Sequence, residues 1–318
     1  MENNLTNEER LLQIAEAKKT SKRICASYLW LIAIQSVLTM FFVLAFLRLT
    51  WGFTDKYLGL TSYGMIVAVA VSTIFVVKRY QKILNFKIPM ATKGDWDAKF
   101  IIKAALVFIG LSCFVSALMN LVVLLLESSG INYPIVNPIN FTDDIFSNVA
   151  VVIMTCVSAP IFEELYFRGI LVHGLKKHGY VFAILASTTL FAFSHQGLPS
   201  VAGIFVASLG LAYISIRTNS IIPGMIIHAI NNIFATSEVF LMETNFIYVF
   251  YAFEVIAIIY ALGFVFKHRH DIKAYINEHK SIEFPTFFMS WQGVVCIILL
   301  IGSILPANGA EELLNILS

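Results

Sequence analysis

The sequence predicts an all-α polytopic membrane protein, a bundle of helices that cross the bilayer. Of its 318 residues, 58% are hydrophobic and only 13% are charged, and the mean hydropathy is +0.79. Water-soluble domains carry about 25% charged residues. The apolar residues also gather in runs of the length that a hydrocarbon core of about 30 Å requires, which is about 20 residues of helix. A soluble globular protein is therefore excluded.

Eight or nine helical spans are expected from the apolar runs that follow one another along the chain. They cover residues 26–49, 59–78, 101–126, 146–170, 180–196, 200–217, 220–240, 246–266 and 288–305. No internal repeat is found. We divide the chain into a cytoplasmic leader (1–24), one membrane domain (25–306) and a short tail (307–318).

The leader is polar, so no signal peptide is indicated and the first span should stay in the membrane as an anchor. Thr6 followed by Glu9 has the spacing of a capping box, which predicts a short helix on the membrane surface. Lysines and arginines gather in the leader and in the connections at 78–103, 171–179 and 267–273, whereas acidic residues gather in the alternate connections. The positive-inside rule then predicts a multi-pass protein with a cytoplasmic amino terminus. We expect a bacterial cytoplasmic membrane.

Several kinds of site are not indicated. The four cysteines, Cys25, Cys113, Cys156 and Cys296, lie in or beside apolar runs without CxxC spacing, so neither a disulfide framework nor a cysteine metal site is expected. The sequence contains no phosphate loop, dinucleotide fingerprint or interleaved basic and aromatic pattern. The expected partners are therefore membrane lipids and a peptide or membrane-protein substrate, and not nucleic acid; the sequence does not fix an oligomeric state.

The fourth run contains the stretch IFEELYFRG, residues 161–169, with three ionisable side chains. A charge near the bilayer centre costs at least about 2.5 to 3.5 kcal/mol, so such residues usually face the interior of the bundle. Glu164 and Arg168 are four residues apart, within about 40° on a helix, and are predicted to pair. Glu163 points about 100° away and has no partner on its own helix, which suits it to accept a proton from water. Pro160 lacks an amide proton and should loosen the turn before it.

Two further runs carry imidazoles. His195 ends the fifth run, four residues after Phe191, while His228 and Asn232 lie four apart in the seventh, so that the amide can hold the imidazole. Counting about 1.5 Å per residue, Glu163 and His228 lie roughly 10 to 15 Å below the cytoplasmic surface, and His195 about 20 Å. The alternative is structural: a charge cluster that locks two helices together, and histidines satisfied in the core. The combination on three separate helices favours a catalytic site.

Taken in order, Glu-Glu-x-x-x-Arg (Glu163, Glu164, Arg168), Phe-x-x-x-His (Phe191, His195) and His-x-x-x-Asn (His228, Asn232) resemble the three motifs of the CPBP family. This is the CaaX protease and bacteriocin-processing group, also called the Abi family of intramembrane proteases. The resemblance covers about residues 145–240 and implies an eight-helix core, to which one further span is added here. It implies that Glu163 activates water, that His195 and His228 position the water or stabilise the oxyanion, and that Asn232 supports the oxyanion. Glu164 and Arg168 would be supporting residues.

The resemblance implies an intramembrane endopeptidase that hydrolyses a peptide bond of a membrane-associated or lipidated substrate. In the preferred reading no cofactor is required. The alternative is Zn²⁺ held by Glu163, His195 and His228, although the two histidines do not share a helix as they do in HExxH. Other functions left open are a non-catalytic membrane scaffold, a bacteriocin-immunity protein of the same fold, and a transporter, for which no pair of interrupted helices in matching halves is found.

Two further expectations concern residues outside the motifs. Glu254, a lone acid in the eighth span, is expected to pair with a hydroxyl or an interior amide. His173 and His178 flank two lysines in a cytoplasmic turn and are expected to be solvated.

Overall fold

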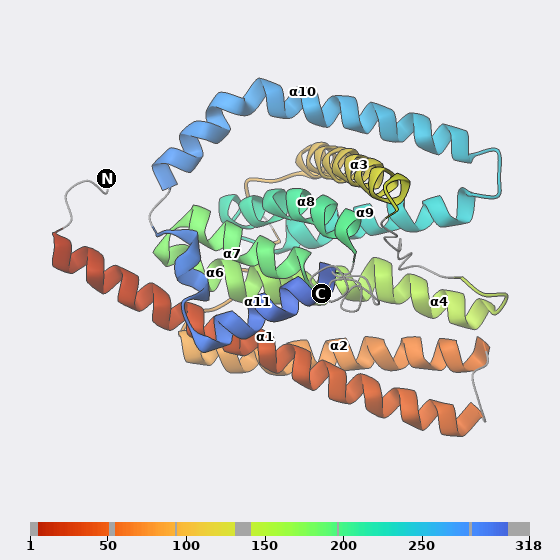
Figure 1. Cartoon of the computed structure of the whole chain (residues 1–318), viewed down its shortest axis with the longest axis horizontal. Coiled ribbons are helices and arrows are strands. Elements are labelled where there is room, and N and C mark those ends of the chain that lie inside the picture. The colour runs from red at the N-terminus through yellow and green to blue at the C-terminus, as the bar shows by residue number, and fades with distance from the viewer. Residues whose placement is uncertain are drawn as a thin grey trace.

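The computed structural model describes residues 6–50, 55–92, 94–130, 141–195, 197–279 and 282–304. Within these ranges the chain forms helices and no strand, which confirms the all-α class (Figure 1). The α-helices are α1 (Asn7–Thr50), α2 (Asp55–Leu84), α3 (Ala98–Ser128), α4 (Ile145–Ile153), α5 (Ala159–Glu163), α6 (His173–Leu175), α7 (Tyr180–Ala192), α8 (Leu198–Arg217), α9 (Ile222–Leu241), α10 (Ile247–His279) and α11 (Trp291–Ile304). Two π-helices, η1 (Met154–Ser158) and η2 (Glu164–Val172), and two 3₁₀ helices, η3 (Lys176–His178) and η4 (Phe284–Phe288), complete them. The predicted tail, 307–318, lies outside the described residues.

Six helical stretches in the described part of the chain are long and apolar enough to cross a membrane. They are Asn7–Leu49, Gly59–Leu84, Ala98–Ser128, Ile145–His178, Pro199–Arg217 and Ile247–His279. The multi-pass membrane class is therefore confirmed. Three predicted spans are helical but are not among these six. Helix α9, in the run at 220–240, has 20 residues, whereas α7 and α11, in the runs at 180–196 and 288–305, have 13 and 14. The last two fall below the roughly 20 residues that a span needs.

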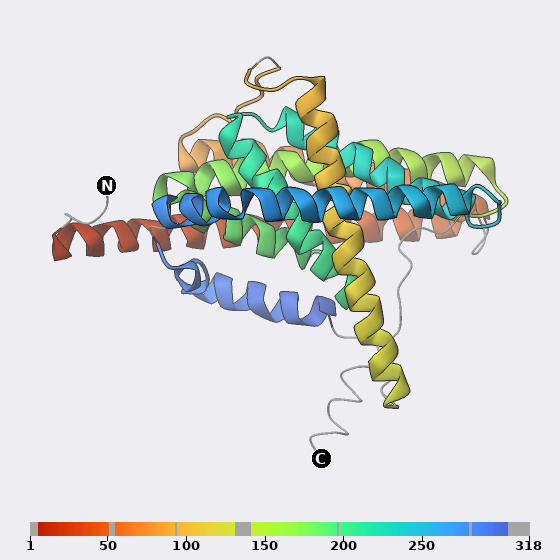
Figure 2. The same cartoon turned by 90° about the horizontal axis from the view of Figure 1, so that it is seen from above.

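The long helices do not all run in one direction. In Figure 1, α10 runs along one edge of the molecule, while α1 and α2 run side by side along the opposite edge. Figure 2 shows that α3 crosses α10 steeply and that its carboxyl-terminal end projects beyond the bundle. The run at 101–126 is thus a helix, as predicted, but it is not aligned with its neighbours.

The predicted capping box forms at the start of α1. The Thr6 amide donates to Glu9 Oε2 at 2.8 Å, and the Glu9 amide donates to Thr6 Oγ1 at 3.3 Å. From there α1 continues for 44 residues, so no break in the helix marks the predicted boundary at residue 24. Asp144 caps α4 in a similar way. Its carboxylate accepts hydrogen bonds from both the hydroxyl and the amide of Ser147. These bonds, the hydroxyl's first, hold the pKa of Asp144 below its ordinary range.

The turn at 171–179 differs from expectation, because His173 and His178 are buried and not solvated. His173 Nε2 lies 2.9 Å from Ser215 Oγ on α8, and His178 Nε2 lies 2.9 Å from Thr20 Oγ1 on α1. The chain turns inward through η3 and then reverses at Gly179, whose φ of 131° favours glycine. Sequence polarity alone placed this turn in solvent, whereas neighbouring helices cover it.

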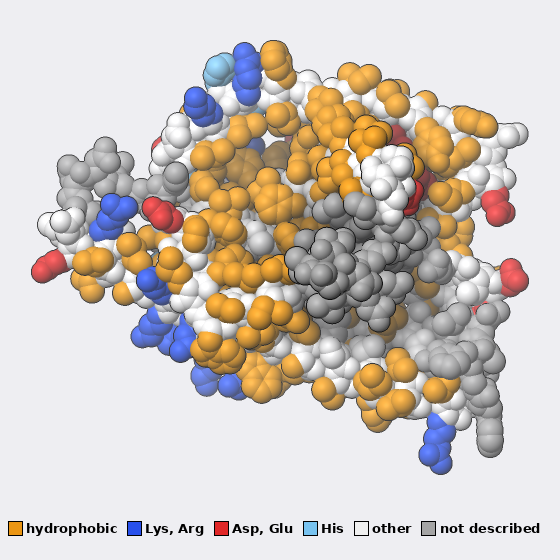
Figure 3. Space-filling model, viewed as in Figure 1, with side chains coloured by type: hydrophobic (Ala, Val, Ile, Leu, Met, Phe, Trp, Pro, Cys, Tyr) orange, Lys and Arg blue, Asp and Glu red, His pale blue; other side chains and the backbone are white. Residues whose placement is uncertain are grey.

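Most lysine and arginine side chains in this view lie toward one end of the molecule, whereas acidic side chains are seen at both ends (Figure 3). The clustering of the basic side chains agrees with their gathering in alternate connections. The orientation in the membrane remains a prediction.

The main hydrophobic core surrounds η2. Tyr166, Ile170 and Leu171 are fully buried there, together with Phe167 at 4% exposure. Buried residues from α1, α2, α7 and α11 belong to the same cluster. The segment that carries the acidic motif is therefore enclosed on several sides, and its side chains are held in fixed directions.

Candidate active site

The acidic motif lies on a helix with two π-helical stretches. Pro160 stands in the first turn of α5, directly after η1, and η2 begins at Glu164. This bears out the expectation that Pro160 loosens the preceding turn. Short π-helical stretches within α-helices are frequent at functional sites.

Asn232 supports this loosened turn. In a π-helical turn the carbonyl of Thr155 would accept from the amide of residue 160, but proline has no amide proton. The Asn232 side chain fills that role, because its Nδ2 donates to the Thr155 carbonyl at 2.8 Å. The predicted backing of His228 by Asn232 is not the bond that forms. One of the two Nδ2 protons of Asn232 is used by Thr155, and the second is left for another acceptor.

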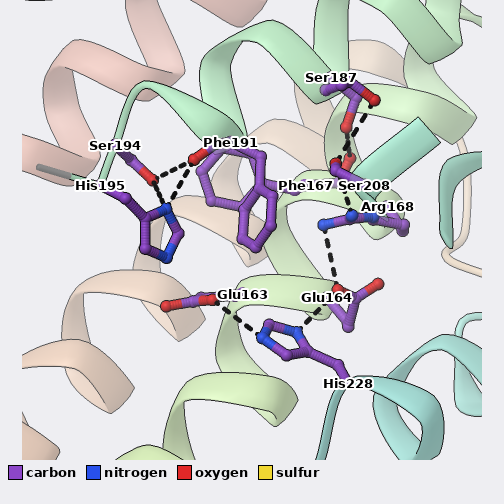
Figure 4. A network of polar contacts seen from close by, with 11 residues as sticks. Glu163, Glu164, Phe167, Arg168, Ser187, Phe191, Ser194, His195, Ser208 and His228 are labelled. Atoms are coloured by element: carbon purple, nitrogen blue, oxygen red, sulfur yellow. Dashed lines mark hydrogen bonds and ion pairs between the residues drawn. The ribbon is translucent and has the colours of Figure 1, made fainter. Parts of the chain in front are cut away.

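Glu164 and Arg168 form the predicted pair. Arg168 Nη1 lies 3.0 Å from Glu164 Oε1, and neither side chain is exposed. Charges buried this deeply require partners. Arg168 gains two more, since its Nη2 donates to Ser208 Oγ on α8 at 2.8 Å and its guanidinium lies 4.5 Å from the centre of the Phe191 ring on α7. The pair thus joins η2, α7 and α8 (Figure 4).

His228 joins the same pair from α9. Its Nδ1 lies 3.1 Å from Glu164 Oε1. Glu164, already paired with Arg168, is a carboxylate and can only accept, so we infer that Nδ1 of His228 carries the proton. A carboxylate on one imidazole nitrogen fixes the ring orientation and leaves the other nitrogen free to act. Glu164, and not Asn232, is therefore the residue that orients His228.

Glu163 lies in different surroundings. Its side chain is 28% exposed, and its Oε2 stands 3.7 Å from His228 Nε2. This separation is too long for a direct hydrogen bond. The carboxylate also lines a cavity of about 860 Å³. Figure 4 shows the Glu163 carboxylate pointing toward His228, with the His195 ring on the same side. One water can lie within reach of Glu163 and His228 together.

His195 lies near this group in Figure 4, although it was predicted to lie deeper than Glu163 and His228. Helix α7 ends at Ala192, and the following turn carries His195. Its Nδ1 lies 3.0 Å from the Phe191 carbonyl, which can only accept, so Nδ1 carries the proton and Nε2 is free. The Phe191 ring lies 5.0 Å from the His195 ring and 5.7 Å from the His228 ring. The Phe191 ring therefore packs against both imidazoles. Gln196, the next residue, lies outside the described part.

A zinc ion held by Glu163, His195 and His228 would require the three side chains to converge on one point. Glu163 Oε2 and His228 Nε2 are 3.7 Å apart and could share an ion. No group of three His, Cys, Asp or Glu side chains among the described residues is placed to hold a metal, however, and His195 does not complete the set. The arrangement does not fit the three-ligand site, so no step below is routed through a metal.

Gly224 was missed in the sequence. A Cβ added to this glycine would stand 2.9 Å from Glu164 Oε2. Only glycine leaves room here for the buried carboxylate, whose Oε2 has no hydrogen-bond partner among the described residues. The sequence holds one indication of this role: Gly224 precedes His228 by four residues, so the two lie on the same face of the helix.

Outside the site, Glu254 has a different partner from the one predicted. The thiol of Cys113 donates to Glu254 Oε1 at 3.4 Å, in place of a hydroxyl or an amide. A thiol is a small, weak donor that hydropathy treats as apolar. All four cysteines are free.

Comparison with known proteins finds a match for the same part of the chain. A family model described as type II CAAX prenyl endopeptidase, Rce1-like, matches residues 145–234. No curated protein and no solved structure matches the chain. The matched segment runs from the start of α4 into α9 and contains all three motifs. Residues 145–234 are thus similar to the Rce1-like type II CAAX prenyl endopeptidase family, which confirms the resemblance of the three motifs to the CPBP family.

Proposed function

We propose that the protein is an intramembrane endopeptidase that hydrolyses a peptide bond of a membrane-associated or lipidated substrate. The observation that carries the proposal is the contrast between the two adjacent glutamates. Glu164 is fully buried and occupied by Arg168 and His228, whereas Glu163 lines the cavity and faces the free nitrogen of His228. A carboxylate that is reachable by water and is not neutralised by an arginine is suited to general base catalysis.

The reaction needs a base, a nucleophile and donors for the oxyanion. Glu163 takes a proton from the water that it shares with His228, and the hydroxide attacks the carbonyl carbon of the scissile peptide bond. The negative charge then moves to the carbonyl oxygen. Glu163 returns its proton to the leaving amine as the carbon–nitrogen bond breaks, so the carboxylate is regenerated.

The Asn232 side chain can donate its second amide proton to the oxyanion. With the proton on Nδ1, a neutral imidazole accepts at Nε2, so His195 and His228 can position the attacking water. One well-placed donor is worth about 3 to 4 kcal/mol of transition-state stabilisation. In the preferred reading Glu163 acts without a cofactor.

The test replaces Glu163 with glutamine. Glu163→Gln keeps the shape of the side chain but removes the base, so cleavage should fall by at least about a hundredfold while the protein folds and inserts as before. Membrane peptidomes of cells carrying the intact protein or Glu163→Gln give the measurement, because they reveal substrates without presupposing them. Thermal unfolding of the purified proteins checks the fold.

Glu243→Gln is the matched control, because Glu243 is exposed and lies outside the site. It should leave the peptidome unchanged. If Glu163→Gln gave the same peptidome as the intact chain, the proposed base would be wrong, and a non-catalytic scaffold or immunity protein would become the better account.

A further inference from the structure

The cavity beside Glu163 extends well beyond the catalytic group. Its walls are one face of α1, part of α2, the segment from Phe162 to Phe167, the turn at 193–194 after α7, and the last turns of α11. Helices α1 and α11 lie outside residues 145–234, so the family match describes neither wall.

The cavity extends along α1. On α1 its lining residues recur every three or four positions from Tyr28 to Val43, so they form one face of the helix. Fifteen residues of α-helix measure about 22 Å. A fully extended chain covers about 3.3 to 3.6 Å per residue, so about six residues would fill this length. This length fits an extended strand of peptide.

The lining supplies hydrogen-bonding groups but little charge. Among the described lining residues only Glu163 is an acid or a base of the Asp, Glu, Lys, Arg or His type. Gln35, Ser36 and Thr39 on α1 face the cavity, and Thr73 does so from α2. Backbone amides that leave water need partners, and these side chains can provide them. A charged side chain of the substrate would find no counter-charge along α1.

Helix α11 closes the cavity with Ile298, Leu299 and Gly302. The helix packs on α1, where Cys296 Sγ lies 3.9 Å from the Cys25 carbonyl. A Cβ added to Gly302 would meet no atom of the described residues within 4 Å. Because Gly302 lines the cavity, a larger side chain at residue 302 would take up space beside it.

We propose that this cavity is the substrate groove, that it takes an extended, uncharged peptide segment of about six residues, and that α11 limits its width at Gly302. The proposal rests on the peptidase function proposed above. It assigns specificity to a helix that carries none of the three motifs.

Binding can be measured apart from catalysis. The purified Glu163→Gln protein is titrated with a fluorescent hexapeptide of alanine, leucine and threonine, with the same peptide carrying a central lysine, and with a fluorescent long-chain fatty alcohol. The uncharged peptide should bind at least tenfold more tightly than the lysine peptide. If the fatty alcohol bound more tightly than the uncharged peptide and displaced it, the groove would be a hydrocarbon site and the proposal would fail.

Gly302→Leu tests the wall and Gly263→Leu is its control, because a Cβ at Gly263 on α10 likewise meets nothing within 4 Å and does not line the cavity. Gly302→Leu should weaken binding of the uncharged hexapeptide at least tenfold, and Gly263→Leu should leave it unchanged. Leu299→Ala removes part of the wall instead and should tighten binding of a hexapeptide that contains tryptophan.

Cleavage by the chain with Glu163 intact separates the two proposals. If peptide binding depended on residue 302 but no peptide were cleaved, the substrate-groove proposal would stand and the peptidase proposal would be wrong. Cleavage that proceeds equally with glycine or leucine at residue 302, with equal binding, would overturn the groove and leave the peptidase standing.

Discussion

Adjacent glutamates take different roles here because the helix directs them into different surroundings. Glu164 is fully buried between Arg168 and His228, whereas Glu163 is 28% exposed in the cavity wall. The buried carboxylate of Glu164 accepts from both Arg168 and His228 and fixes their positions. The exposed one keeps access to water. The same residue type thus supplies both the support and the proposed base.

Loss of the Glu164 charge should unfold the site. Glu164→Gln leaves Arg168 buried without its counter-charge, and breaking a buried pair in this way costs about 3 to 5 kcal/mol. The melting temperature of the purified protein should fall, and cleavage should be lost as His228 is released. Glu163→Gln, measured beside it, should melt close to the intact protein. An unchanged melting temperature with full activity in Glu164→Gln would contradict the pairing.

Gly224 gives a subtler test of the same carboxylate. Gly224→Ala places a methyl group 2.9 Å from Glu164 Oε2, so the carboxylate must shift and His228 with it. We expect at least a tenfold loss of kcat. In Gly210→Ala on α8, the new Cβ meets nothing within 4 Å, and activity should stay unchanged. Equal activity in both variants would show that the position of Glu164 does not matter for the reaction.

The sequence predicted contacts within one helix better than contacts between helices. The Glu164–Arg168 pair follows from spacing by four residues, which places two side chains on one face. The contact between Glu164 and His228 joins residues 64 positions apart, and no spacing rule reaches that far. The partner of Asn232 depends on the missing amide proton of Pro160, a detail that only the π-helical turn makes visible.

At the scale of the element, hydropathy located the helices but not their ends. Helix α10 continues to His279, well past the predicted end at residue 266, because its polar last turns remain helical. Helix α7 stops at Ala192, before the predicted end at residue 196. Hydropathy measures only the apolar part of a helix, and it carries no information on crossing angles such as that of α3.

The crossing of α3 and α10 depends on close approach at one glycine. A Cβ on Gly110 would collide with the Ala257 carbonyl and the Ala261 side chain. Gly110→Ala should therefore force the two helices apart and lower the free energy of unfolding by about 1 to 3 kcal/mol. Denaturation of the purified protein in detergent gives the measurement.

Gly263→Ala is the control on the same helix pair, since its Cβ would meet nothing. It should be neutral or slightly stabilising, because alanine favours helix over glycine. If Gly110→Ala were as stable as Gly263→Ala, the close packing of α3 on α10 would be wrong.

For the whole molecule, the charge distribution predicts orientation. Lys19 and Asp143 are both exposed and come from the basic and the acidic connections respectively. With the amino terminus in the cytoplasm, a membrane-impermeant maleimide added to intact cells should label Asp143→Cys and leave Lys19→Cys unlabelled. The chain with its four native cysteines provides the baseline. The reverse pattern would invert the topology.

The arrangement of the helices was beyond the reach of the sequence. Helix α11 packs on α1 from the other end of the chain, where Cys25 and Cys296 meet. Their proximity arises from the three-dimensional path of all the intervening helices. Sequence reasoning therefore named the residues of the candidate site, whereas the cavity beside Glu163 is visible only in the folded chain.

The π-helical register of residues 154–158 and 164–172 affects how related chains should be aligned with this one. An i→i+5 turn holds an additional residue relative to an α-helical turn. Shortening the chain by one residue there would allow ordinary winding to return and would swing Glu163 out of the cavity, even though every motif letter was kept. A one-residue gap in an alignment of this stretch would thus change the direction of Glu163 more than most single substitutions would.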